Sequence, residues 1–151
     1  MSHPILNNEQ IQHKIRRIAY QIYENNIDEN EIIIAGITNS GFTLAKRIKK
    51  DLDQISEIDS TICEVRVDKK NPLEPIETSL SSEEYINKSI VLVDDVLNSG
   101  TTLIYGVRHF LAVPLKKFQT AVLVDRNHKK YPVKADFKGI SLSTSLNETV
   151  K

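Results

Sequence analysis

The stretch Ile90-Val91-Leu92-Val93-Asp94-Asp95-Val96-Leu97-Asn98-Ser99-Gly100-Thr101-Thr102-Leu103 decides the fold of this 151-residue chain. Its apolar start predicts a strand that is buried on both faces of a parallel sheet. Asp94 and Asp95 follow where we expect that strand to end, at the edge where open α/β sheets bind ligands. A short polar turn then leads into a helical pattern, and such a turn suits a phosphate.

The polar residues of this stretch have two different chemistries. Ionised carboxylates repel a phosphate but accept hydrogen bonds from sugar hydroxyls, so Asp94 and Asp95 suit a ribose. The turn offers backbone N–H groups and hydroxyls to the phosphate. The sequence therefore predicts a ribose 5-phosphate site. The alternative is an Asp-capped turn before an ordinary helix, because Asp, Asn, Ser and Gly all favour turns and caps.

Length and composition indicate one globular domain over residues 1–151. An apolar content of 40%, a net charge of 0 and a pI of about 6.9 exclude a global basic field toward nucleic acid or membrane. The single Cys63 fits a reducing compartment, and its apolar surroundings favour a buried structural thiol. The chain shows no signal pattern or membrane-spanning run, so we expect a cytoplasmic protein that does not engage membranes.

Apolar periodicity predicts alternating strands and helices and hence a mainly parallel sheet flanked by helices. A helix is expected over residues 8–24, capped by Asn7 or Asn8. The other expected elements are a strand at 31–37, a helix around 42–52, a strand within 55–67, a strand at 90–93, a helix from 103, a strand at 120–124 and a short strand near 135–137. Residues 68–88 lack a pattern and predict a long loop over the site.

A second glycine-containing turn joins the predicted strand at 31–37 to the next helix. Gly36 and Gly41 stand five residues apart, as in a P-loop. Phe42 stands where a P-loop requires lysine, which excludes a nucleoside triphosphate site of that type. The alternative to a ligand loop here is a plain helix-capping turn.

The Asp94–Thr102 string resembles the phosphoribosyl-diphosphate (PRPP) signature of type I phosphoribosyltransferases. The resemblance implies their α/β fold with a small irregular hood. It also implies that Asp94 and Asp95 act as catalytic residues that hold the ribose 2′- and 3′-hydroxyls. The 5′-phosphate is then bound by the loop of Asn98, Ser99, Gly100, Thr101 and Thr102.

In that family the turn after the first strand binds the pyrophosphate of PRPP through backbone N–H groups. The resemblance assigns this role to Thr38, Asn39, Ser40 and Gly41, with a non-proline cis peptide expected between Asn39 and Ser40. A loop that closes over PRPP contributes a basic side chain in the family. Lys69 and Lys70 are the candidates here, although a solvated charge run explains them equally well.

Within the family, the chain is most similar to pyrimidine-operon regulators that double as uracil phosphoribosyltransferases. The similarity includes Val124-Asp125-Arg126-Asn127-His128 and much of the remaining chain. It implies that Asp125 contacts the pyrophosphate or its Mg²⁺. Val96, Arg126 and His128 then lie near the nucleobase.

Three departures from those regulators concern the pyrophosphate and base halves of the site. Ser40 replaces the arginine of their Thr-Arg-Gly turn, and Asn127 replaces the glycine of their Asp-Arg-Gly-His segment. The loop reads Arg66-Val67-Asp68-Lys69-Lys70 instead of Leu-Tyr-Arg-Asp-Asp. Each charge-assisted arginine contact contributes ~1.5–3 kcal/mol, and Lys69 or Lys70 is the candidate to compensate for its loss.

The resemblance implies transfer of ribose 5-phosphate from PRPP to a nucleobase, with Mg²⁺ held mainly by PRPP and no dedicated metal cage. Uracil is the first candidate base and a purine the second. An RNA-binding regulator and an inactive binding subunit remain alternatives, and at least a homodimer is expected. RNA binding requires a basic face, for which the candidates are Arg16, Arg17, Lys46, Arg47, Lys49, Lys50, Lys116 and Lys117.

Overall fold

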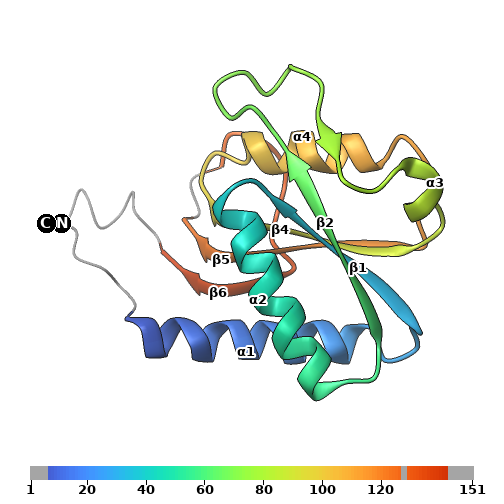
Figure 1. The fold of residues 1–151 in the computed structure, drawn as a ribbon. Coiled ribbons are helices and arrows are strands. Elements are labelled where there is room, and N and C mark those ends of the chain that lie inside the picture. The colour runs from blue at the N-terminus through green and yellow to red at the C-terminus, as the bar shows by residue number, and fades with distance from the viewer. Residues whose placement is uncertain (1–6, 127–128, 143–151) are drawn as a thin grey trace, which may run out of the picture.

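The computed structural model describes residues 7–126 and 129–142 of the chain. Figure 1 shows a central sheet with helices on both sides. The elements are α1 (Asn8–Asn25), β1 (Glu31–Ile37), α2 (Ser40–Ile55), β2 (Asp59–Arg66), β3 (Glu77–Thr78), α3 (Ser82–Tyr85), β4 (Ser89–Leu97), α4 (Thr101–Phe110), β5 (Lys117–Asp125) and β6 (Phe137–Ser141).

The six strands lie in the order β3-β2-β1-β4-β5-β6, and only the pairing of β3 with β2 is antiparallel. Ala35 pairs with Cys63 on one side and with Leu92 on the other. All three side chains are completely buried, as expected for the middle of a parallel sheet. The carboxyl ends of β1, β4 and β5 therefore meet at one edge of the sheet, which confirms the expected α/β fold class.

Two apolar layers hold the helices against the sheet. On one face, Ile18 of α1 and Ile48 of α2 pack with Ile34 of β1. On the other face, Phe110 of α4 and Tyr85 of α3 pack with Leu92 of β4, and the two aromatic rings meet edge to face at 4.9 Å. Between Ser89 and Asp94 the strand β4 is wholly apolar, because it is buried on both faces.

Local signals explain where the helices begin. Asn7 accepts a hydrogen bond from Gln10 N–H at 2.8 Å, and the Gln10 side chain accepts one from Asn7 N–H at 2.9 Å. This capping box confirms the expected start of α1. The described helices include none whose length and apolarity would allow it to cross a bilayer.

Several predicted boundaries were wrong. β5 begins at Lys117 rather than 120, because its first residues pair with Ser89 and the residues after it in β4. Asp136 does not start β6, because its carboxylate accepts the Thr120 N–H at 2.9 Å, so the strand begins at Phe137. The region 68–88, expected to be patternless, contains β3 and α3.

Candidate active site

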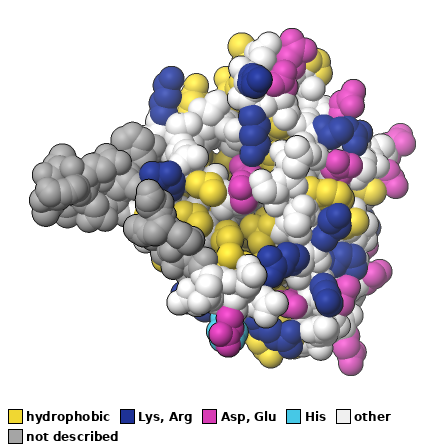
Figure 2. Space-filling model, turned by 60° about the vertical axis from the view of Figure 1, so that its left-hand side comes forward, with side chains coloured by type: hydrophobic (Ala, Val, Ile, Leu, Met, Phe, Trp, Pro, Cys, Tyr) yellow, Lys and Arg dark blue, Asp and Glu magenta, His cyan; other side chains and the backbone are white. Residues whose placement is uncertain are grey.

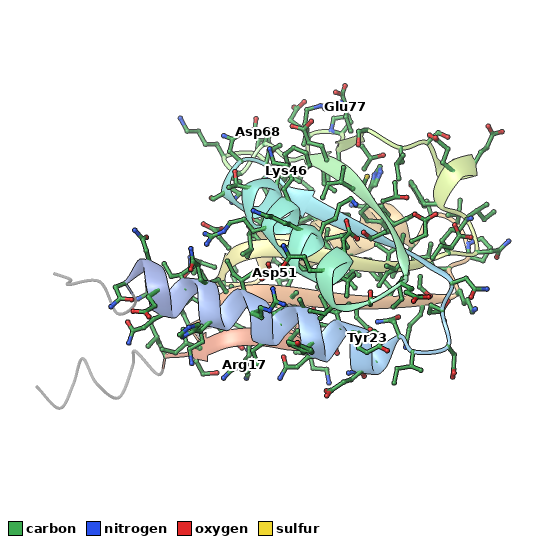
Figure 3. All side chains as sticks on the ribbon, turned by 60° about the horizontal axis from the view of Figure 1, so that its bottom comes forward. Arg17, Tyr23, Lys46, Asp51, Asp68 and Glu77 are labelled. Carbon is green, nitrogen blue, oxygen red and sulfur yellow. The ribbon has the colours of Figure 1, made fainter. Side chains whose placement is uncertain are left out.

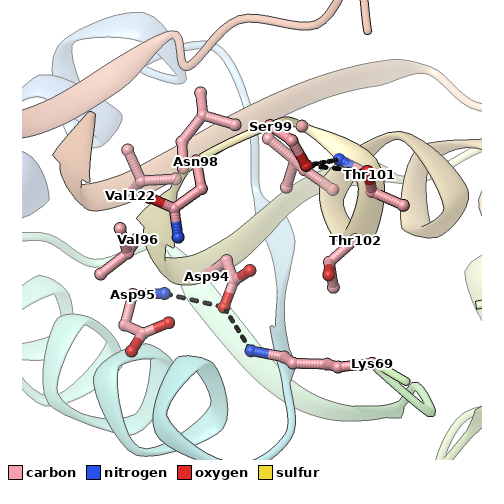
Figure 4. A pocket seen from close by; sticks show the side chains of 12 residues that line it. Lys69, Asp94, Asp95, Val96, Asn98, Ser99, Thr101, Thr102 and Val122 are labelled. Carbon is pink, nitrogen blue, oxygen red and sulfur yellow. Dashed lines mark hydrogen bonds and ion pairs between the residues drawn. The ribbon is translucent and has the colours of Figure 1, made fainter. Parts of the chain in front are cut away.

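A cavity of about 330 Å³ opens at the carboxyl edge of β4. It is lined by residues 94–103, Lys69 and Val122, so the predicted sugar and phosphate residues share one hollow (Figure 4). Val96, which we predicted for the nucleobase, is also in its wall. Figure 2 shows basic, acidic and apolar side chains mixed over a face of the molecule. The cavity is large enough for part of a sugar phosphate, and the polar groups that suit one line it.

Asp94 is a buried carboxyl group at the floor of this cavity, only 3% exposed. Burial, together with the neighbouring Asp95 carboxyl, raises the pKa of Asp94 to about 7. Its Oδ1 accepts the Asp95 N–H at 2.9 Å and lies 3.6 Å from Lys69 Nζ. Lys69 counteracts the raised pKa in part. Asp94 therefore changes charge near neutral pH, and a further cation would favour its ionised form.

Asp95 has a different environment because it is less buried than Asp94. Figure 4 shows its backbone N–H bonded to the Asp94 carboxylate. Partial burial raises the pKa of Asp95, but hydrogen bonds with the Asp94 and Ser40 side chains and the Lys69 charge lower it more, so it ends below its ordinary value. The pair therefore combines one readily ionised carboxylate with one that resists ionisation.

The predicted phosphate loop turns sharply between β4 and α4. Gly100 has φ +89° and precedes the first residue of α4. The Ser99 and Thr101 hydroxyls lie 2.8 Å apart, and Ser99 Oγ accepts the Thr101 N–H at 3.3 Å. The first N–H groups of a helix have no intrahelical acceptor, so those of α4 that follow Thr101 are available to a phosphate in the cavity.

The predicted pyrophosphate turn lies beside the two carboxylates. The side chain of Ser40, the first residue of α2, lies close enough to Asp95 to help lower the pKa of that carboxyl group. A Cβ on Gly41 would lie 2.9 Å from Val93 O and 3.1 Å from Asp94 Oδ1, so only glycine allows this close approach. Thr38 and Asn39 complete the turn, and Thr38 N–H donates to Val65 O at 2.9 Å. None of the four turn residues is among those that line the cavity.

The cis peptide bond was predicted one residue too late. It joins Thr38 to Asn39 instead of Asn39 to Ser40. The Asn39–Ser40 peptide already belongs to the first turn of α2, since Asn39 O accepts the Thr43 N–H at 3.2 Å.

The structure separates the two candidate lysines of the loop. Lys69 lines the cavity and pairs with Asp94. Lys70 is exposed and does not line it, and its backbone N–H donates to Asp68 Oδ1 at 3.0 Å. Of the two, Lys69 is the one in position to meet a bound diphosphate.

Arg126 and Asp125 lie beside the cavity without lining it, whereas Val96 is part of its wall. Arg126 N–H donates to Leu97 O at 3.0 Å, which ties the end of β5 to the end of β4. Asp125 is 2% exposed, and its carboxylate lies 3.5 Å from Lys129 Nζ and 3.7 Å from Lys138 Nζ. Neither lysine was predicted from the sequence. Lys129 stands four residues after Asp125, a spacing that brings side chains together on a helix, but Asp125 is the last residue of a strand. His128 lies outside the described residues.

The eight basic residues proposed for an RNA-binding face do not form a single surface. Arg17 donates to Lys138 O at 3.2 Å and Gly139 O at 2.6 Å, at the edge of the sheet (Figure 3). Lys116 pairs with Glu29 at 3.0 Å, beyond the other end of α1. Arg16, Arg47 and Lys50 do meet, around a cavity of about 290 Å³ that His13 and Asp51 also line.

The donor set of the site fits Mg²⁺ bound through a substrate. The described residues contain no cluster of three or more His, Cys, Asp or Glu side chains suited to a metal. Mg²⁺ usually takes one or two carboxylates and completes its shell with phosphate oxygens and water. Asp94 and Asp95 offer such oxygens, and the raised pKa of Asp94 reflects a buried carboxylate with little compensating charge.

Comparisons with known proteins agree with this geometry. The family profile described as Phosphoribosyl transferase domain matches residues 2–150. "Bifunctional protein PyrR" of Limosilactobacillus reuteri is 32% identical over 160 residues, covering 99% of this chain and 90% of the relative. The PyrR of Streptococcus sanguinis is 35% identical over 141 residues, covering 90% of this chain and 81% of the relative.

Solved structures show the same fold. The hypoxanthine phosphoribosyltransferase of Trypanosoma cruzi superposes with a TM-score of 0.81 at 15% identity, over 95% of this chain and 83% of that one. A hypoxanthine-guanine phosphoribosyltransferase from Bacillus anthracis gives a TM-score of 0.76 at 23% identity, over 94% of this chain and 83% of that one. At such low identity these matches establish the fold and leave the substrate open.

Proposed function

Since this chain belongs to the phosphoribosyl transferase domain family and is a phosphoribosyltransferase, we propose that its reaction transfers ribose 5-phosphate from PRPP to uracil and releases pyrophosphate. One observation carries the proposal. Asp94, Asp95 and the loop of residues 98–102 line the same cavity at the carboxyl edge of the sheet. Uracil is preferred over a purine because the relatives with the higher sequence identity are PyrR proteins.

The two halves of the cavity bind the two ends of the sugar phosphate. Asp94 and Asp95 accept hydrogen bonds from the ribose hydroxyls, which requires the ionised form of at least one carboxylate. The N–H groups and hydroxyls of residues 98–102 hold the 5′-phosphate at the start of α4. Bound in this way, the C1 atom of the ribose is presented to the incoming base at the edge of the sheet.

Catalysis then depends on positioning and on charge stabilisation of the departing pyrophosphate. The base nitrogen attacks C1 as the C1–oxygen bond to pyrophosphate breaks, through an oxocarbenium-like transition state. The turn of Thr38, Asn39, Ser40 and Gly41 offers backbone N–H groups to the leaving group. Bound Mg²⁺ would neutralise charge on the diphosphate, and Asp94, Asp95 and Asp125 are the carboxylates that would hold it or its waters.

Lys69 supplies a positive charge that the pyrophosphate turn lacks. The turn lacks it because Ser40 stands where the similar regulators have an arginine. The Lys69 ammonium already lies 3.6 Å from Asp94, so it reaches the sugar end of the site. On arrival of PRPP it exchanges the carboxylate for an oxygen of the diphosphate. Lys70 has no such reach and serves only as a solvated charge on the loop.

The base-side residues complete the assignment. Val96 faces the cavity, and Arg126 is tied by its backbone to Leu97. Together with His128 they form the proposed nucleobase site. We further propose a cytoplasmic, single-domain protein that forms at least a homodimer.

Pyrophosphate release from Mg²⁺·PRPP tests the reaction, with uracil, hypoxanthine, guanine, xanthine and adenine offered separately. We expect release with uracil and little with the purines. Release with a purine alone would correct the base and keep the reaction. No release with any base, from a protein that still binds PRPP, would favour the binding-subunit or regulator alternatives.

A second function, RNA binding, is supported by one observation. Arg16, Arg47 and Lys50 gather around one cavity on the α1–α2 face, although Asp51 also lines it. Binding through such a cluster weakens steeply as salt rises, because it displaces counterions from the RNA phosphates. RNA affinity that falls with salt in wild type, and is reduced in Arg47→Ala, would support this function. Salt-independent affinity would contradict it.

A further inference from the structure

The phosphate loop is held from outside the cavity by a segment that follows β5. Ser99 O accepts two backbone hydrogen bonds, from Lys130 N–H at 2.6 Å and from Tyr131 N–H at 3.1 Å. Residues 130 and 131 are not among those that line the cavity, whereas Ser99 and Gly100 are. The two donors therefore approach the loop from its outer side.

The planar peptide between Ser99 and Gly100 determines the direction in which the Gly100 N–H points. The bond between Ser99 and Gly100 is trans, so its C=O and N–H point in opposite directions. With the Ser99 carbonyl held outward by two donors, the Gly100 N–H points inward. In the part of the chain that the structure describes, no hydrogen bond is formed by this N–H. It is thus a donor directed toward the cavity.

Packing around Gly100 reinforces the same orientation. Gly100 has φ +89°, which glycine adopts without strain. A Cβ placed on it would lie 2.7 Å from Val133 Cγ1 and 3.6 Å from Tyr131 Cβ. The Tyr131 ring in turn meets the Tyr105 ring of α4 edge to face at 6.3 Å. The loop is therefore confined between α4 and residues 130–133.

We infer that the backbone of Lys130 and Tyr131 is a positioning element for the 5′-phosphate, holding the Ser99–Gly100 peptide so that Gly100 N–H faces the ligand. This inference rests on the proposed function of the loop and extends it to residues outside the cavity. Preorganised donors bind more tightly because the cost of orienting them is met during folding.

Two substitutions at Lys130 separate the effect of its backbone N–H from that of its side chain. Lys130→Pro deletes the N–H that donates to Ser99 O, and Lys130→Ala keeps it while removing the ammonium. Calorimetry with ribose 5-phosphate probes the phosphate end of the site alone. We expect Lys130→Pro to weaken this affinity at least tenfold and Lys130→Ala to stay within twofold of wild type.

A second ligand separates positioning from general damage. Binding of Mg²⁺·pyrophosphate, which uses the turn of residues 38–41 rather than the phosphate loop, should stay within twofold in Lys130→Pro. Loss of both ligands to the same extent would mean that the variant damages the whole site, and that result would overturn the inference. Wild-type affinity of Lys130→Pro for ribose 5-phosphate would also overturn it, leaving the proposed function intact.

A second pair of variants decides the matter if Lys130→Pro does not fold. Tyr131→Ala removes the ring that presses on α4, and Tyr131→Phe keeps it. We expect at least threefold weaker ribose 5-phosphate binding in the first and recovery in the second. Equal affinities would overturn the inference. If wild type itself fails to bind ribose 5-phosphate, the proposed function of the loop fails, and the inference fails with it.

Discussion

Lys69 Nζ lies 3.6 Å from Asp94 Oδ1 and joins the loop after β2 to the carboxyl end of β4 (Figure 4). The two partners differ strongly in exposure, since the Lys69 side chain is 43% exposed and that of Asp94 is 5% exposed. A buried carboxylate is thus faced by a cation that solvent can reach. A bound Mg²⁺·diphosphate can take the place of this cation without leaving Asp94 unpaired.

The first prediction concerns Lys69. Its charge lowers the pKa of Asp94, so Lys69→Met should raise that pKa and move the acidic limb of the kcat/KM profile for PRPP to higher pH. Loss of a charge-assisted contact to the diphosphate should also reduce kcat/KM at pH 7 by about tenfold or more. Lys70→Met is the matched control and should behave like wild type. Equal losses in both variants would show that only overall charge matters.

The second prediction concerns stability and pH. The pKa of Asp94 is raised to about 7 in the folded state from an ordinary value of 3.8, so the folded protein holds this proton more tightly than the unfolded chain. The stabilisation is fully present below about pH 4 and is lost as pH rises toward 7. Asp94→Asn avoids this loss and should be more stable than wild type at pH 8 by ~2–4 kcal/mol.

Urea unfolding at several pH values measures this difference. The advantage of Asp94→Asn should shrink steadily between pH 8 and pH 4.5. An advantage that stays constant over that range would mean that Asp94 titrates outside it.

The third prediction concerns Gly41. A methyl group there would meet the backbone of Val93 and Asp94 at 2.9–3.0 Å, so Gly41→Ala must push α2 away from β4. The expected result is a loss of at least tenfold in kcat/KM for PRPP. Gly106→Ala is the control, because its nearest contact, at 3.0 Å, is the flexible end of the Leu92 side chain and alanine favours the helix. Crystal structures of both variants would report any shift of α2.

The fourth prediction concerns Arg17. Its guanidinium covers two carbonyls of the edge strand β6, at Lys138 and Gly139. Arg17→Ala should lower the free energy of unfolding by ~1–2 kcal/mol, because it leaves these acceptors to solvent and opens the sheet edge. Arg16→Ala removes a half-exposed ion pair with Asp51 and should change stability by less than ~0.5 kcal/mol. Equal effects would contradict a specific role of Arg17.

Local patterns predicted much of the fold. The Asn7 and Gln10 pair marked the start of α1, and β1 has the predicted bounds of Glu31 and Ile37. The helix α3 was missed although Ser81 and Glu84 form a capping box that is visible in the sequence. The early start of β5 could not be predicted, because it depends on pairing with β4 rather than on local periodicity.

The candidate site was predictable where its residues are adjacent in the chain. Asp94 to Thr102 form one string, and they line one cavity. Contacts between distant segments were not predictable. Three features depend on how separate loops meet. They are the pairing of Lys69 rather than Lys70 with Asp94, the approach of Lys138 to Asp125, and the two hydrogen bonds to Ser99 O.

The central claim is that Asp94 and its neighbours form a PRPP site. Isothermal titration of Mg²⁺·PRPP into wild type and Asp94→Asn, with folding of both checked by circular dichroism, tests it most directly. We expect saturable binding by wild type and at least tenfold weaker binding by the variant. Unchanged affinity in Asp94→Asn, or no binding by folded wild-type protein, would contradict it.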